Sequence, residues 1–179
     1  VEHMLFKGTE KRRSWHILNR MENVGGDLNA FTDKEETIVY SAFLKKDFVR
    51  ALELLTDIVF RSTFPQHEIE KERGVILEEI ECYEDNPAEL IFDDFEDILF
   101  RHHALGHNIL GSPRYVKCFD SALAKRFAGR YYHPVNAVLF VYDVNNMEML
   151  ATCDLSSKLS SVTANVGYVA GIGQDDNGT

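Results

Sequence analysis

The chain has 179 residues, 45% of them hydrophobic, and a formal net charge of −10 at pH 7. Its length permits one sizeable hydrophobic core, and its acidic balance excludes nucleic acid as an expected partner, because binding phosphate needs a basic face. No apolar run approaches the roughly 18 residues that a membrane helix needs. The three cysteines are widely spaced and odd in number, which predicts neither a disulfide framework nor a cysteine zinc site.

The first residues, Val1-Glu2-His3-Met4-Leu5-Phe6-Lys7-Gly8-Thr9, read as the end of an H-x-x-E-H helix whose first histidine would lie two residues before Val1. In this motif both histidines stand one turn apart on one helix face and can reach a single Zn²⁺. The glutamate stands beside the water that the metal activates. Glu2 is therefore the candidate base and His3 a candidate ligand. A Glu-His pair alone is a weak signal, so the assignment depends on the residues downstream.

A second helix and two strands are predicted next. The helix starts at Ser14, a plausible N-cap, and ends at Gly25-Gly26. Residues 28–32 and 37–44 then read as strands joined by a short turn, the second rich in Thr, Ile, Val, Tyr and Phe.

Three further helices follow along the chain. Asp47 is predicted to cap the first of them, the second is a long acidic helix over 68–83, and the third starts at Asn86-Pro87 with Asn86 as its N-cap. The apolar residues expected on the buried side of the third helix are Leu90, Ile91, Phe95, Ile98 and Leu99.

The remaining pattern predicts a loop around 102–113, a helix over 121–131 and a strand over 137–142. The fold class is therefore α+β, with helices packed on one face of a small, mostly antiparallel sheet. From residue 145 the pattern dissolves, and residues 173–179 look disordered. The histidines of the loop lack a set of partners and are interpreted as turn residues.

A zinc site that catalyses hydrolysis keeps three protein ligands and an open position for water, so a ligand must come from elsewhere in the chain. Glu79 lies 76 residues after His3, and Glu72 precedes Glu79 by seven residues. At about 100° per residue this spacing returns to nearly the same helix face, so both carboxylates can face one pocket. The alternative is a solvated acidic face, which we expect for most carboxylates between 68 and 97.

Ordered blocks of residues carry a resemblance to a known family. The blocks are Glu2–Thr9, Gly25–Thr32, Glu36–Tyr40, Glu72–Ile80, His103–Gly106 with Gly111, and Tyr132–Ala137. In this order and spacing the chain resembles the pitrilysin/insulysin family of zinc peptidases, and within it the branch of mitochondrial processing peptidase. The resemblance covers roughly residues 1 to 143.

The resemblance implies roles for particular residues. Glu2 would be the general base, His3 and Glu79 would bind Zn²⁺, and Glu72 would be a second catalytic carboxylate that orients a ligand or the water. Asn29 and Ala30 would bind the backbone of an extended substrate peptide at the edge of their strand, by β-augmentation. An ordinary strand flanked by turns is the alternative for this segment.

The function implied is that of a zinc-dependent endopeptidase that cleaves extended peptides. Residues 1–144 would be part of the first half of the family's clamshell, without its N-terminal strands, and 145–179 a divergent or disordered tail. The expected partners are a peptide substrate and a second homologous half, fused or separate. The bacterial cytoplasm or the mitochondrial matrix is expected rather than an extracellular location.

The alternative is a non-catalytic homologue that serves as a structural or substrate-binding subunit. Such homologues have typically lost residues of the zinc motif, whereas Glu2, His3 and Glu79 are all present here. The residue two positions before Val1 distinguishes the two functions, because the enzyme requires histidine there. Without that ligand and without the second half, the 179-residue chain alone is expected to be inactive.

Overall fold

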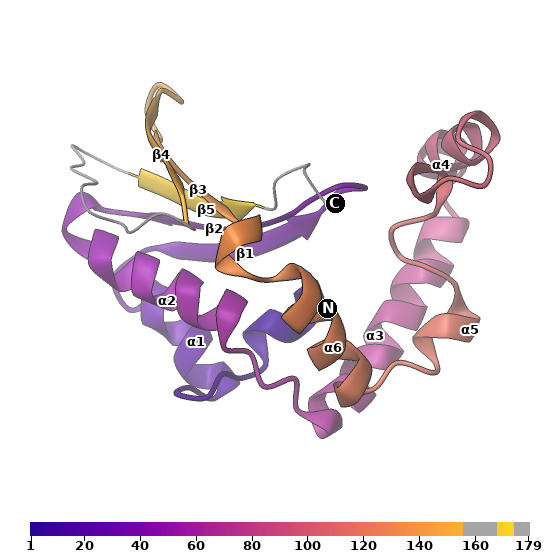
Figure 1. Ribbon diagram of the computed structural model, residues 1–179, viewed down its shortest axis with the longest axis horizontal. Coiled ribbons are helices and arrows are strands. Elements are labelled where there is room, and N and C mark those ends of the chain that lie inside the picture. Colours follow the sequence, from indigo (N-terminus) through magenta and orange to yellow (C-terminus); the bar gives the residue numbers. More distant parts are fainter. Residues whose placement is uncertain (156–167, 174–179) are drawn as a thin grey trace.

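The computed structural model describes residues 1–155 and 168–173 and shows helices arranged around a five-stranded sheet (Figure 1). The order of strands across the sheet is β1-β2-β5-β3-β4, and every neighbouring pair is antiparallel. The strands are β1 (Asp27–Thr32), β2 (Thr37–Phe43), β3 (Val138–Asp143), β4 (Met149–Asp154) and β5 (Tyr168–Gly173). The α+β class predicted from the sequence is confirmed.

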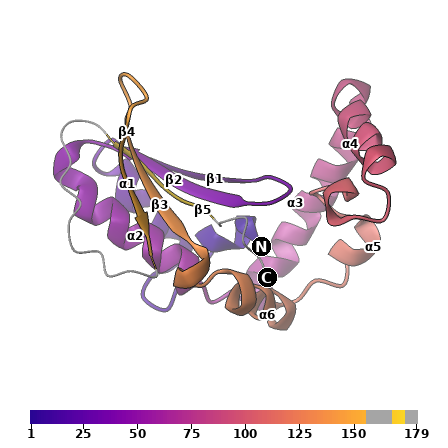
Figure 2. The same cartoon turned by 45° about the horizontal axis from the view of Figure 1, so that its top comes forward.

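The helices form two groups. Two of them, α1 (Ser14–Glu22) and α2 (Phe48–Phe60), cover one face of the sheet, while α3 (Gln66–Glu84) and α4 (Pro87–Leu99) stand beside it (Figure 1). The shorter helices are α5 (Pro113–Val116) and α6 (Ser121–Tyr131), with the 3-10 turns η1 (Glu2–Phe6), η2 (Lys45–Asp47), η3 (Ala104–Gly106) and η4 (Pro134–Asn136). The β1–β2 hairpin projects toward α3, and the N-terminus lies below it (Figure 2).

The hydrophobic core fixes the position of η1. Fully buried side chains come from α1, α2 and the sheet, and Leu5 of η1 joins them with 0% of its surface exposed. Burying a side chain of this size stabilises the fold by roughly 1.5–3 kcal/mol relative to leaving it in water. The core-facing side of η1 is therefore packed against the hydrophobic core, and its other side is turned toward α3.

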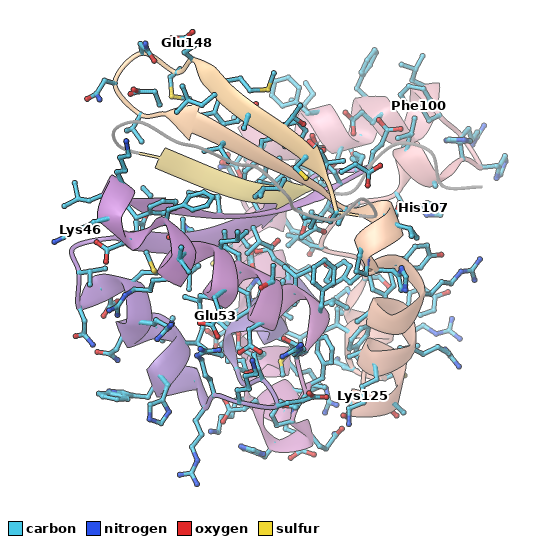
Figure 3. The ribbon with its side chains drawn as sticks, turned by 60° about the vertical axis from the view of Figure 1, so that its left-hand side comes forward. Lys46, Glu53, Phe100, His107, Lys125 and Glu148 are labelled. Carbon is cyan, nitrogen blue, oxygen red and sulfur yellow. The ribbon has the colours of Figure 1, made fainter. Side chains whose placement is uncertain are left out.

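A partly buried ion-pair cluster fixes the segment that follows η1. Asp57 of α2 is 3% exposed and accepts hydrogen bonds from Thr9 Oγ1 at 2.8 Å and from Arg12 Nη1 at 2.5 Å. Arg12 also donates through Nη2 to both carboxylate oxygens of Glu53, at 2.7 and 2.8 Å. Glu53 lies on α2 in the helix layer beneath the sheet (Figure 3). Because each charge has a partner, the cluster connects the chain after η1 to α2.

Helix starts were predicted with mixed success. Asn86 is the N-cap of α4, and its side chain accepts a hydrogen bond from the backbone of Ala88 at 3.3 Å, as predicted. Asp47 is the N-cap of α2, but its side chain makes no capping bond. Ser14 is the first residue of α1 and not its N-cap, because Arg13 takes the extended cap conformation.

The predicted buried side of α4 was wrong. No residue of α4 is buried, and Ile91, Phe95, Ile98 and Leu99 are each more than half exposed. Helical periodicity shows that the apolar side chains share a face, but it contains no information on what covers that face. Among the described residues, no helix is long and apolar enough to cross a membrane.

The sequence reading missed both strands that lie after residue 145. β4 pairs with β3, and β5 inserts between β2 and β3. The signal for β5, Tyr168-Val169-Ala170-Gly171-Ile172-Gly173, is weak because two of its six residues are glycines, which have low strand propensity. The division of the chain at residue 144 stays a prediction, and the residues expected to be disordered, 173–179, lie outside the described residues except for Gly173.

Candidate functional site

Glu2 and His3 belong to η1, a 3-10 helix of five residues. Its hydrogen bonds run from Met4 N to Val1 O at 3.0 Å and from Lys7 N to Met4 O at 3.2 Å, a spacing of three residues. The sequence predicted the end of an α-helix here, but a five-residue element with this bonding is tighter. Met4 and Leu5 are buried, while Glu2 and His3 are only partly covered and can serve a site.

Both predicted carboxylates of α3 face the imidazole of His3. His3 Nδ1 lies 3.3 Å from Glu72 Oε2, and His3 Nε2 lies 3.7 Å from Glu79 Oε2. The seven-residue spacing predicted that these carboxylates share a helix face, and the structure shows that they do. The roles of His3, Glu72 and Glu79 in metal binding stay predictions.

The contacts of Glu72 select which ring nitrogen of His3 is available to a metal. When Nδ1 carries the ring proton, it donates to Glu72, and the lone pair of Nε2 faces Glu79. The other oxygen of Glu72, Oε1, pairs with Lys7 Nζ at 2.6 Å. Both oxygens of Glu72 are therefore occupied, whereas the side chain of Glu79 is 46% exposed. Glu72 is suited to orienting His3, and Glu79 to binding a cation beside it.

The separation of these two donor atoms can be tested against zinc geometry. Two ligand atoms at about 2.0–2.1 Å from a tetrahedral zinc lie about 3.3–3.4 Å apart. His3 Nε2 and Glu79 Oε2 lie 3.7 Å apart, so the two atoms would have to approach each other only slightly to share one zinc ion. Within residues 1–155 and 168–173 there is no group of three or more His, Cys, Asp or Glu that could hold a metal. The described residues thus fit zinc as two of the three protein ligands that a catalytic site requires.

Glu2 lies between two pockets. One of about 340 Å³ is lined by Glu2 and His3 together with Asn29 and Glu72. The other, of about 400 Å³, is lined by Glu2 and His3 together with Glu79 and a mainly apolar wall. Thr32 Oγ1 donates a hydrogen bond of 2.5 Å to Glu2 Oε2. The candidate base is therefore held by one oxygen at a position that both pockets reach.

The predicted substrate strand, β1, is an edge of the described sheet, because its one neighbour there is β2. Asp33 N–H donates to Glu36 O at the hairpin turn, at 2.8 Å. Antiparallel strands alternate between bonded and non-bonded pairs, so the N–H groups of Leu28 and Ala30 point toward the open edge. Ala30 therefore lies where an added strand would pair.

Side chains of β1 cap these two amides. Asn29 Oδ1 accepts from Ala30 N and Asp27 Oδ1 accepts from Leu28 N, each at 2.8 Å. Capping of this kind protects an open edge from unwanted strand pairing. A peptide that pairs with Ala30 has to displace the carboxamide of Asn29, which is then free to bind the peptide backbone.

Sequence reasoning missed several residues of this site. Lys7 could have been found, since a lysine one turn beyond His3 on the same short segment can reach the same carboxylate. Thr32 and Thr37 reach the site because of the register of the β1–β2 hairpin, and Tyr132 reaches it from the end of α6. Neither feature leaves a local signal in the sequence. The loop histidines were interpreted correctly, since His102 and His103 lie in a turn and a bend and His103 Nδ1 accepts a hydrogen bond from Leu105 N at the start of η3.

Comparison with known proteins adds an independent finding. Residues 1–113 match the family model for insulinase, peptidase family M16. The zinc protease YmxG of Bacillus subtilis is 36% identical over 141 residues, which are 79% of this chain and 34% of that protein. The beta subunit of mitochondrial-processing peptidase from Bos taurus is 44% identical over 120 residues, 67% of this chain and 24% of that protein.

A solved structure shows the same fold over nearly the whole chain. The peptidase M16 inactive domain from Pseudomonas fluorescens matches with a TM-score of 0.63 at 12% identity, over 97% of this chain and 63% of that one. The chain spans between about a quarter and a third of the length of the two curated relatives described above.

Proposed function

The chain belongs to the insulinase family of peptidases, family M16, and on this premise we propose that the protein is a zinc-dependent endopeptidase that cleaves extended peptides. The resemblance predicted from the sequence is thereby confirmed. The observation that carries the proposal is the approach of His3 Nε2 to Glu79 Oε2, at 3.7 Å, beside the carboxylate of Glu2.

His3 and Glu79 would hold the zinc, with a third protein ligand that the described residues do not supply. A histidine two positions before Val1 stays the prediction for that ligand. Glu72 orients His3 through Nδ1, and Lys7 balances the charge of Glu72. Bound zinc would supply a Lewis acid that lowers the pKa of water and polarises the scissile carbonyl group.

Glu2 would carry the proton transfers. As general base its carboxylate takes a proton from the attacking water, and as general acid it returns that proton to the leaving amine. Thr32 holds Glu2 Oε2, so the other oxygen, Oε1, is the one available to the water. A base fixed in this way loses little freedom when the substrate binds.

The open edge of β1 would bind the substrate. Main-chain hydrogen bonds to Ala30 require a peptide in extended conformation, and Asn29 adds a side-chain contact in the pocket it shares with Glu2. Most backbone groups of a folded protein are already paired, so a folded substrate would present such a strand less readily. A second homologous half, fused or separate, would close over the peptide and exclude bulk water.

The test uses the full-length protein loaded with zinc and an unstructured peptide substrate. Glu2→Gln keeps the size of the side chain but removes the base, so we expect stoichiometric zinc and a loss of at least about 100-fold in kcat. Glu10→Gln, an exposed glutamate on the same segment, is the matched control and should leave both unchanged. The same peptide embedded in a stably folded domain should resist cleavage.

The same experiment distinguishes the enzyme from the alternative, a non-catalytic subunit that binds peptides. A wild-type protein that binds zinc stoichiometrically but hydrolyses none of a diverse peptide library would favour that alternative. Equal activity of Glu2→Gln and wild type would remove Glu2 from its assigned role.

A further inference from the structure

A chain of three hydroxyl groups leads to the carboxylate of Glu2. Tyr132 Oη donates to Thr37 Oγ1 at 3.3 Å, the hydroxyls of Thr37 and Thr32 lie 3.3 Å apart, and Thr32 donates to Glu2 Oε2 at 2.5 Å. Three separate elements supply these groups. Thr32 and Thr37 are cross-strand partners at the end of the β1–β2 hairpin, and Tyr132 is the C-cap of α6.

The direction of donation follows from counting protons. An ionised carboxylate only accepts, so Thr32 gives its single proton to Glu2. Thr32 can then only accept from Thr37, and Thr37 can only accept from Tyr132. One arrangement therefore satisfies all three contacts, and in it every hydroxyl is polarised toward Glu2.

The surroundings of Tyr132 support its position as the terminal donor. Burial raises the pKa of Tyr132; its hydrogen bond with Thr37 lowers it, and the charge of Glu2 raises it again, with a net upward shift. The phenol therefore keeps its proton over the neutral range. Tyr132, Thr37 and Thr32 line the same pocket of about 400 Å³ as Glu2, so the chain of hydroxyls borders the site itself.

We propose that Thr32, Thr37 and Tyr132 are positioning residues that hold Glu2 in the orientation needed for proton transfer. The inference rests on the proposed function, because it assigns these hydroxyls a role only if Glu2 is the base. Thr32 holds one oxygen of Glu2, Thr37 and Tyr132 hold Thr32, and the remaining oxygen of Glu2 faces the reacting water. The hairpin register thereby connects the substrate strand to the geometry of the base.

The test compares variants of the full-length, zinc-loaded protein on an unstructured peptide. Thr32→Val removes the hydroxyl at nearly constant volume and should lower kcat by about 10- to 100-fold, with KM changed by no more than about twofold. Thr32→Ser restores the donor and should recover most of the activity. Tyr132→Phe should lower kcat by a smaller factor, because it acts through two further hydroxyls.

Controls separate positioning from a structural effect. Thr56→Val removes a hydroxyl that bonds to Leu52 O and Glu53 O within α2, and it should leave kcat unchanged. Zinc content should remain stoichiometric in Thr32→Val, whereas a collapse of η1 would lower it through His3. In a Glu2→Gln background, Thr32→Val should cause no further loss, because its effect passes through Glu2.

The outcomes distinguish the two proposals. An inactive wild-type protein, or an active Glu2→Gln variant, would overturn the proposed function. An active wild type and an inactive Glu2→Gln, together with a Thr32→Val that matches wild type in kcat, would overturn the positioning role alone. A Thr32→Ser variant as impaired as Thr32→Val would also overturn it, because the serine hydroxyl retains the donor.

Discussion

Glu72 provides the sharpest test of how the site is held together. Its side chain is 12% exposed and accepts from His3 Nδ1 at 3.3 Å while pairing with Lys7 Nζ at 2.6 Å. A hydrogen bond to a charged group contributes about 1.5–3 kcal/mol, and losing the partner of a metal-binding histidine typically weakens metal affinity about 10- to 100-fold. We therefore expect Glu72→Leu to bind zinc about 10- to 100-fold more weakly than wild type.

Glu72→Gln gives an intermediate expectation. The glutamine oxygen still accepts from His3 Nδ1, but the hydrogen bond is no longer charge-assisted. A hydrogen bond between neutral groups is roughly half as strong as a charge-assisted one. Half of the free-energy loss corresponds to a decrease of about 3- to 10-fold in zinc affinity. Affinity is measured by competition between the full-length protein and a chromophoric zinc chelator, and circular dichroism checks that each variant is folded.

Two further variants identify the cause. Glu78→Leu changes the charge of the same helix by the same amount at an exposed position, so it should leave zinc affinity within about twofold of wild type. Lys7→Met combined with Glu72→Leu removes the unpaired ammonium group that would otherwise repel the cation. A Glu72→Leu variant that binds zinc as tightly as wild type would contradict a role of Glu72 in holding His3. A Glu78→Leu variant that weakens binding equally would contradict it too.

Two other predictions concern the frame around the site. Lys34 at the β1–β2 turn is 13% exposed and contacts Asp93 at 3.1 Å, Glu96 at 3.0 Å and the carbonyl of His107 at 2.7 Å. Lys34→Met should therefore accelerate amide hydrogen exchange in α4. Lys46→Met, at the opposite end of the molecule from His107 (Figure 3), should not. Unchanged exchange in α4 of the Lys34→Met variant would contradict this. Burial raises the pKa of Glu53, but hydrogen bonds and charge from Arg12 and Arg20 outweigh it and hold the pKa below 4.5. The ionised carboxylate of Glu53 therefore stabilises the fold above pH 4.5, and this contribution is lost as the pH falls through the lower pKa of the folded state. Thermal unfolding should show Glu53→Gln less stable than wild type at pH 7, with the difference in stability shrinking in acid. A difference that stays constant with pH would contradict this.

Most elements up to residue 143 could be predicted because they have a local signal, whereas the short helix α5 and the 3-10 geometry of η1 were not predicted. Asn86-Pro87 marks the start of α4, strand-forming residues mark β2, and the phase of α3 places Glu72 and Glu79 on one face. Such signals describe an element and its faces. They do not specify the neighbour, which is why the exposed apolar face of α4 and the insertion of β5 between β2 and β3 were not predicted.

The same limit applies within the site. His3 and Glu79 could be paired from the spacing of a known motif, whereas the contact of Thr32 with Glu2 depends on a hairpin register that opposes Thr32 to Thr37. Tyr132 reaches this hairpin from α6, far along the chain. A contact between segments so distant in sequence follows from tertiary packing. The residue pattern within either segment does not predict it.

The geometry of the candidate base and ligand is therefore a tertiary property. The position of η1 depends on its contacts with other elements. Leu5 anchors it to the core, and the contacts between Thr9, Arg12 and Asp57 fix the chain that leaves it. Thr32 and Glu72 then constrain Glu2 and His3 from two different elements, β1 and α3. Because the base and the ligand are neighbours on one short turn, any change that shifts η1 moves both together.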